Sequence, residues 1–104
     1  MAKNFVQDGD VLTLPAPAGG VVSGVPVAIG QLVVVPITDA AAGELFGGKT
    51  NGVWSVAVAT GLTAGASVGI LDGDIVAAAT TDAIACGKLV TAESDGLADW
   101  MLIN

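Results

Sequence analysis

Short apolar runs separated by Gly, Pro, Asn and Asp recur along the whole chain, at the spacing typical of an all-β domain. Three consecutive residues, Val33, Val34 and Val35, favour one strand that is buried on both faces. The pattern predicts a small single-domain β-barrel or sandwich over residues 1–104, with short connections and little helix. Strands are predicted at residues 11–14, 20–22, 25–28, 31–37, 52–58, 67–71, 74–78, 87–90 and 98–103.

The clearest hairpin signal is SVGILDGDIVAA, in which Asp72-Gly73 can supply the positive φ angles of a tight turn between Ile70 and Ile75. Asp72 and Asp74 flank this turn, and two nearby carboxylates raise the question of a cation site. No third or fourth ligand follows them at the spacing of a calcium loop. A hairpin without a metal is therefore the favoured interpretation.

Residues 43–50 read GELFGGKT, which matches the phosphate-binding pattern G-x-x-x-x-G-K-[ST]. A phosphate loop needs a helix after the motif, because backbone N–H groups at a helix N-terminus hold the phosphate. Here Asn51-Gly52 predicts a turn, and VWSVAVAT after it predicts a strand. Before the motif, TDAAAGELF predicts one helical turn with Thr38 or Asp39 as its N-cap, not a buried strand. The context argues against nucleotide binding.

The formal charge is −7, and the cations are limited to Lys3, Lys49 and Lys88 in a chain without Arg or His. Affinity for nucleic acid comes mostly from Lys and Arg, so we expect no nucleic-acid partner and no anionic membrane partner. Missing His removes the commonest general base and the commonest transition-metal ligand. We therefore expect no cofactor and no metal.

Cys86 is the only cysteine, so no intrachain disulfide can form, and a small buried residue is favoured over a nucleophile. The charge-free stretches 11–38 and 50–71 are long enough to span a bilayer, but Pro and Gly interrupt the first and Gly the second. The segment MAKNFVQDGD lacks the apolar run of a secretory signal. Neither a membrane span nor secretion is indicated.

The apolar share is 53 %, but small residues supply it: 18 Ala and 15 Val against 2 Phe and 2 Trp. Charged residues make up only 12 %, against about 25 % in an average globular protein. Much of the surface must therefore be neutral or apolar, which favours burial in an assembly. The alternative is that Ala and Gly line loops without forming one large patch.

Several short stretches in the first half of the chain form a recognisable series. They are Asn4-Phe5-Val6-Gln7, Gly9-Asp10, the Ala-Pro-Ala-Gly-Gly loop at 16–20, Asp39-Ala40-Ala41 with Gly43-Glu44, and Gly52-Val53-Trp54. This series, with a C-terminal strand ending in Asn104, resembles the capsid cement or head decoration proteins of tailed bacteriophages. Over residues 60–104 the resemblance is looser: the Asp72-Gly73 hairpin fits, whereas CGKLV and DWMLIN depart from the pattern.

The resemblance implies a β-barrel-like protein without enzyme activity, made in the host cytoplasm, that coats the capsid exterior of the virion. There it would hold neighbouring subunits of the major capsid protein together, as a homo-oligomer, most simply a trimer. Members of this family are sometimes labelled recombinase-like, and GELFGGKT would support that label. The missing phosphate-loop context and the shortage of positive charge argue against it.

Residues 1–10 are the candidate docking arm, and the alternative is that they form an ordinary first strand of the barrel. Two other functions stay open: a structural component of the phage tail or baseplate, and a nucleotide-binding accessory of a recombinase. The first would share the all-β composition, and the second rests on GELFGGKT alone. The residues expected to bind the capsid are Lys3, Asn4, Phe5, Val6 and Gln7.

Overall fold

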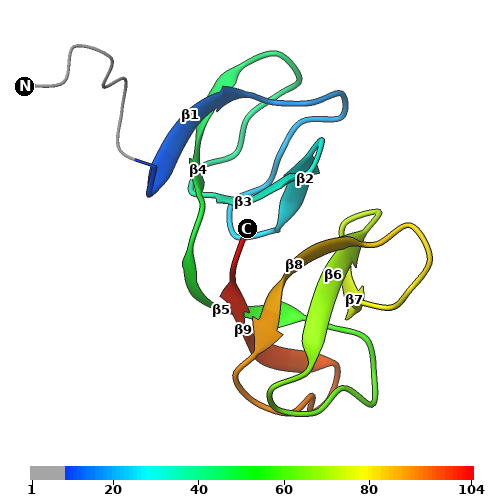
Figure 1. Ribbon diagram of the computed structural model, residues 1–104. Helices are drawn as coiled ribbons and strands as arrows, with labels where there is room; N and C mark the ends of the chain where they lie inside the picture. Colours follow the sequence, from blue (N-terminus) through cyan, green and yellow to red (C-terminus); the bar gives the residue numbers. More distant parts are fainter. Residues whose placement is uncertain (1–8) are drawn as a thin grey trace, which may run out of the picture.

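The computed structural model describes residues 9–104, which form nine β-strands and no helix (Figure 1). This part of the chain therefore contains no helix that could cross a membrane. The expected small all-β fold with little helix is confirmed. The strands are β1 (Val11–Pro15), β2 (Val27–Ile29), β3 (Leu32–Pro36), β4 (Leu45–Lys49), β5 (Gly52–Ala57), β6 (Ser67–Leu71), β7 (Asp74–Ala77), β8 (Ile84–Leu89) and β9 (Leu97–Leu102).

The strands form two antiparallel sheets, one in each of two lobes (Figure 1). The N-lobe sheet has the order β1-β4-β3-β2, and the C-lobe sheet has the order β5-β9-β8-β6-β7. The C-lobe sheet curls toward a barrel, because Val58, just after β5, bridges Ile75 of β7. The Ala59 N–H also donates a hydrogen bond to the Ile75 carbonyl oxygen at 2.9 Å.

Strand β3 contributes to the cores of both lobes. Val33 and Val35 pack in the larger cluster, with Trp100 and other residues of the C-lobe sheet. Val34 points the other way and packs with Phe46 in the N-lobe cluster. All three valines are 0 % exposed, so the predicted burial on both faces is confirmed. Successive residues of a strand face opposite sides, and a wholly apolar run is therefore what this position requires.

The C-terminal residue Asn104 pairs with the backbone of β3. Its side-chain Oδ1 accepts a hydrogen bond from the Val33 N–H at 2.8 Å, and its Nδ2 donates to the Val33 carbonyl oxygen at 2.9 Å. The same Nδ2 donates to the Thr50 carbonyl oxygen at 3.0 Å. On this edge of β3, β4 pairs only with Val35 and Pro36. At Val33 the Asn104 side-chain amide therefore makes the hydrogen bonds that a neighbouring strand would make. In Figure 1 the C-terminus lies between the two lobes.

The predicted hairpin at Asp72-Gly73 is present between β6 and β7. Asp72 has φ of 51° and Gly73 has φ of 87°, as a primed two-residue turn requires. Leu71 pairs with Asp74 directly across this turn. The local sequence was sufficient here, because the turn depends on two adjacent residues and not on distant packing.

Three local predictions are wrong. Residues 20–22 form no strand, and Val21 makes only an isolated bridge to Ala40. The helical turn after Thr38 or Asp39 is absent, because the Asp39 carboxylate instead accepts a hydrogen bond from the distant Ser23 N–H at 2.8 Å. Strand β4 was missed altogether, since its paired glycines are unusual in a strand.

We expect Asn104→Ala to lower the melting temperature, because it leaves the backbone groups of buried Val33 without partners. An unsatisfied buried group costs about 1–3 kcal/mol, and each kcal/mol shifts a domain of this size by roughly 4–8 °C. The matched control is Asn51→Ala, which removes one exposed hydrogen bond to Asp10. Thermal unfolding followed by circular dichroism checks this, and equal shifts for the two variants would contradict the role of Asn104.

Candidate functional site

The motif GELFGGKT lies mostly on strand β4, inside a sheet. Residues 45–49 of the motif pair with β1 across their whole length, and Gly48 and Lys49 also pair with β3. The chain then turns at Asn51 and continues as strand β5. The expectation that no helix follows Lys49 is confirmed. Backbone N–H groups that bond to neighbouring strands are not available to a phosphate.

The two glycines of the motif are explained by packing on opposite faces of β4. A Cβ at Gly48 would lie 2.9 Å from Val34 Cγ2 and 3.3 Å from Phe46 Cε2, inside the N-lobe core. A Cβ at Gly47 would lie 3.0 Å from Ile37 Cδ1 and 3.4 Å from Val11 Cγ1, on the outer face. Neighbouring side chains thus pack directly against β4 and leave no room for a side chain at either position. The two glycines that complete the phosphate-loop motif are explained by this packing.

Thr50, which would bind magnesium in a phosphate loop, instead holds the start of the described chain. Its hydroxyl donates a hydrogen bond to the Gly9 carbonyl oxygen, and its N–H donates to the Asp10 carbonyl oxygen at 3.0 Å. Asn51 Nδ2 also donates to the Asp10 carboxylate at 2.8 Å. Residues 9 and 10 are therefore fixed beside the connection between β4 and β5, where the two lobes join.

The acidic side chains do not gather into a metal site. Within residues 9–104, no three His, Cys, Asp or Glu side chains lie close enough together to hold a metal ion. Asp72 and Asp82 line a cavity of about 490 Å³ between the lobes, whose other walls include Val27 and Ile70. Among the described residues, Asp72 and Asp82 are joined by no third such side chain, so this pair forms no metal site.

Cys86 is fully buried in the C-lobe core, as the sequence predicted. Burial raises the pKa of its thiol from 9.0 to about 11, and a hydrogen bond from Trp100 partly offsets this rise. The Trp100 indole N–H donates to the Cys86 carbonyl oxygen at 3.1 Å. A thiol that is both inaccessible and protonated at neutral pH is a core residue, not a nucleophile.

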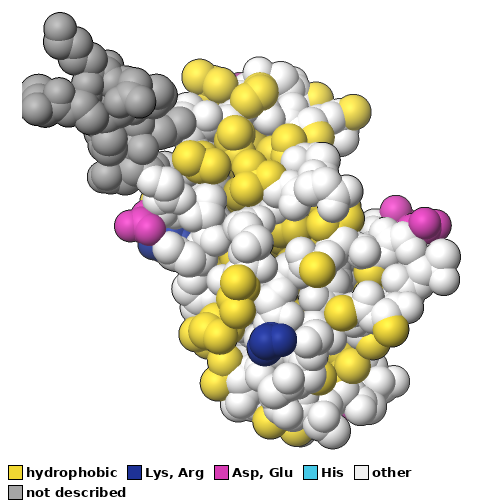
Figure 2. Space-filling view, viewed as in Figure 1, with side chains coloured by type: hydrophobic (Ala, Val, Ile, Leu, Met, Phe, Trp, Pro, Cys, Tyr) yellow, Lys and Arg dark blue, Asp and Glu magenta, His cyan; other side chains and the backbone are white. Residues whose placement is uncertain are grey.

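An apolar patch covers the outer face of the N-lobe sheet. Val11 of β1, Leu45 of β4 and Ile37 after β3 are 39 %, 69 % and 50 % exposed. Val11 and Ile37 meet over Gly47, so these residues form one surface, which we call the N-lobe patch. Figure 2 shows hydrophobic side chains gathered over the N-lobe. The described chain begins at Gly9, two residues before Val11 of this patch.

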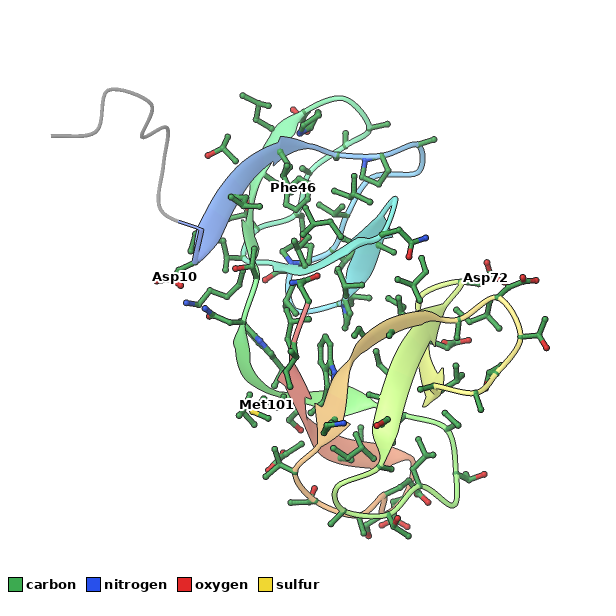
Figure 3. All side chains as sticks on the ribbon, in the orientation of Figure 1. Asp10, Phe46, Asp72 and Met101 are labelled. Carbon is green, nitrogen blue, oxygen red and sulfur yellow. The ribbon has the colours of Figure 1, made fainter. Side chains whose placement is uncertain are left out.

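A second apolar surface lies on the C-lobe sheet. Met101 of β9 pairs with Val53 of β5, and these side chains are 38 % and 56 % exposed. Met101 is labelled in Figure 3 at the side of the C-lobe. This surface was not predicted from the sequence, although LADWMLIN carries a signal for it. Apolar residues occupy both alternating sets of positions, so one set must face outward.

The predicted capsid-binding residues lie outside the described residues, so their role stays a prediction. They are Lys3, Asn4, Phe5, Val6 and Gln7. What the structure adds is their point of attachment, because Thr50 fixes Gly9 beside Val11 and the N-lobe patch. An arm that begins there starts at the edge of an exposed apolar surface.

The described structure offers two exposed apolar sheet faces, while its one cysteine is buried in the core. These features define a small all-β protein whose candidate sites are its exposed apolar faces. The family model of the phage cement proteins matches residues 6–101, which include the second half where the motif resemblance was looser. The chain belongs to this family of structural phage proteins. Searches among curated proteins and solved structures find no match.

We expect no binding of ATP with magnesium, because the motif's backbone groups are engaged in the N-lobe sheet. Isothermal titration calorimetry of the full chain checks this. A dissociation constant in the micromolar range that disappears in Lys49→Ala would restore the motif as a nucleotide site.

We expect the Cys86 thiol to resist thiol reagents at pH 8 in the native protein and to react rapidly in denaturant. Stability should also fall as pH rises from about 9 to 11, because the unfolded thiol ionises in this window while the folded thiol keeps its proton. Labelling kinetics and pH-dependent melting check this, with Cys86→Ala as the control that removes the pH effect. Native labelling at the rate of a free thiol would contradict the burial of Cys86.

Proposed function

We propose that this protein is a capsid cement that binds the outer surface of an expanded phage head and bridges neighbouring subunits of the major capsid protein. The observation that carries the proposal is the family match over residues 6–101. Membership of the family supports a structural role on the capsid of the virion. The exposed apolar surface of both lobes supports binding to other proteins, since a monomer in solution gains nothing from it.

The docking site in this proposal combines the arm, residues 1–10, with the N-lobe patch. The arm supplies Phe5 and Val6, whose full burial would contribute about 1.5–3 kcal/mol each. The patch supplies Val11, Ile37 and Leu45 beside the start of the arm. Together they would give the capsid one continuous apolar surface, with Lys49 at its edge because it pairs with Val11.

Weak single contacts are sufficient for a cement protein when its copies are linked. Once one copy is bound, a linked copy meets its own capsid site at a high effective concentration. The homotrimer implied by the family resemblance would provide such linkage. In this proposal avidity, not a deep pocket, produces the stabilisation of the head. Light scattering of the free protein tests the trimer.

We expect removal of residues 1–7 to abolish protection of heads while leaving the fold intact. Full-length protein mixed with expanded, undecorated heads should bind saturably and raise the temperature at which the heads rupture. The truncated form should melt normally but fail to protect the heads, because the burial of Phe5 and Val6 is lost from every linked copy. If the truncation lowers the protein's own melting temperature as well as its protection of heads, residues 1–7 belong to a core strand. A loss of about 1 kcal/mol in stability lowers the melting temperature of a domain of this size by roughly 4–8 °C.

The matched variant on the patch is Leu45→Asp, which places a charge at a residue that is 69 % exposed in the free protein. It should weaken head binding with little change in the melting temperature, because most of the Leu45 side chain is already exposed to solvent in the free protein. Equal protection by all forms would remove both the arm and the patch from the mechanism. Absence of binding by the full-length protein would refute the cement function and leave the tail or baseplate role to be tested.

A further inference from the structure

The last strand of the C-lobe has apolar residues on both faces. Ala98, Trp100 and Leu102 point into the core and are at most 5 % exposed. On the opposite face, Leu97 and Met101 are 53 % and 38 % exposed. A strand at the surface of a monomer normally carries polar residues on its outer side. β9 therefore resembles a strand that is covered on both sides.

Neighbouring strands extend this surface, which we call the C-lobe face. Met101 pairs with Val53 of β5 on one side and with Lys88 of β8 on the other. Val90 follows β8 and is 49 % exposed, and its N–H donates to the Asp99 carbonyl oxygen at 2.8 Å. The exposed residues of the face are Val53, Ser55, Ala57, Lys88, Val90, Leu97, Asp99 and Met101.

Among the described residues, this face carries one cation and one anion. Lys88 lies opposite Met101, and Asp99 lies two residues along β9 from Met101. The two charged residues are therefore diagonal neighbours on adjacent strands, about 7–8 Å apart between Cα atoms. The Lys88 ammonium donates to the Ser67 hydroxyl at 2.9 Å. The face is electrically neutral, whereas the whole chain carries −7.

This balance favours a second copy of the same chain as the partner. Two copies of this acidic chain repel each other electrostatically. A face with no net charge can contact the same face of a second copy with little of this repulsion. A two-fold axis that passes between Lys88 and Asp99 exchanges their places, so that each Lys88 meets the Asp99 of the other copy. The same rotation brings Met101 and Val53 of the two copies against each other.

We propose that the C-lobe face forms a two-fold contact between two copies of this chain. Two reciprocal charge pairs, Lys88 with Asp99, set the register, and the exposed apolar side chains provide the burial. A hollow of about 280 Å³ beside Lys88, lined by Ala85 and Ile103 among others, can receive an apolar side chain of the second copy. Figure 2 shows the single Lys on the C-lobe with hydrophobic side chains on the same surface.

This contact goes beyond the proposed cement function and leaves the docking site free. The N-lobe patch lies on the other lobe and on a different sheet. A trimer would need a further surface, because a face-to-face contact closes at two copies. Pairing of two copies through the C-lobes would leave both arms available to neighbouring capsid sites.

The test is a charge exchange on the full chain, followed by analytical ultracentrifugation. Wild type should show a reversible association step that doubles the mass of the species present at low concentration, whether that species is a monomer or a trimer. Lys88→Asp and Asp99→Lys should each weaken this association by about tenfold or more, because each brings like charges together at both pairs. The double variant, Lys88→Asp with Asp99→Lys, should return the dissociation constant to within about threefold of wild type.

Two further variants distinguish a specific contact at this face from non-specific association through exposed apolar surface. Met101→Lys should abolish the two-copy step, whereas Leu45→Lys on the N-lobe patch should leave it unchanged, and each variant should melt as wild type does. Wild type that stays a monomer at high micromolar concentration, or a double variant that is not restored, would overturn the contact. So would equal weakening by Met101→Lys and Leu45→Lys. Loss of head binding with intact pairing would refute the cement function alone.

Discussion

The burial of β3 on both faces is the constraint on which the structure depends. Val33 and Val35 belong to the core of one lobe, and Val34 belongs to the core of the other. Neither lobe has many large side chains, since the chain contains 2 Trp and 2 Phe. Sharing one strand between two small cores gives each of them a wall that it could not supply alone. Burial of a strand on both faces also excludes polar residues from it, because a buried polar group without a partner is costly.

A strand in this position has backbone groups that must also be satisfied. β2 pairs with one edge of β3, and β4 pairs with part of the other. At Val33 the missing neighbour is replaced by the Asn104 side chain, which both donates and accepts as a peptide group does. The C-terminus is thereby held between the lobes, and β9 is fixed with one face inward and one face outward.

The same crowding explains the motif that first suggests a nucleotide site. Gly47 and Gly48 are needed because Ile37 and Val34 lie across β4 from opposite sides, within 3.0 Å of where a Cβ would stand. Thr50 then completes the motif by holding Gly9. A match to the phosphate-loop motif can therefore arise from packing alone. The pairing of β4 with β1 and β3 shows that the motif here is a strand of a sheet. Outside this packed region, the described residues expose apolar side chains on the outer faces of both sheets.

The sequence by itself determined the features that depend on neighbouring residues. Alternation and apolar runs indicated eight of the nine strands, the three valines indicated a doubly buried strand, and Asp72-Gly73 indicated the hairpin turn. Burial of Cys86 followed from its type and its isolation. The family was also recognisable from short stretches in the first half, because such motifs can be compared residue by residue without knowledge of the fold.

Only the tertiary structure decided the features that depend on residues far apart in the chain. Strand β4 is recognisable once Val34 and Ile37 are seen to fill the space beside its glycines. Asn104 and Val33 are 71 positions apart, and no local pattern could join them. The choice of outward face for Met101 and Val53 likewise depends on how two sheets curl and meet. Local preferences act over a few residues, whereas close packing and backbone pairing act between whatever segments the fold brings together.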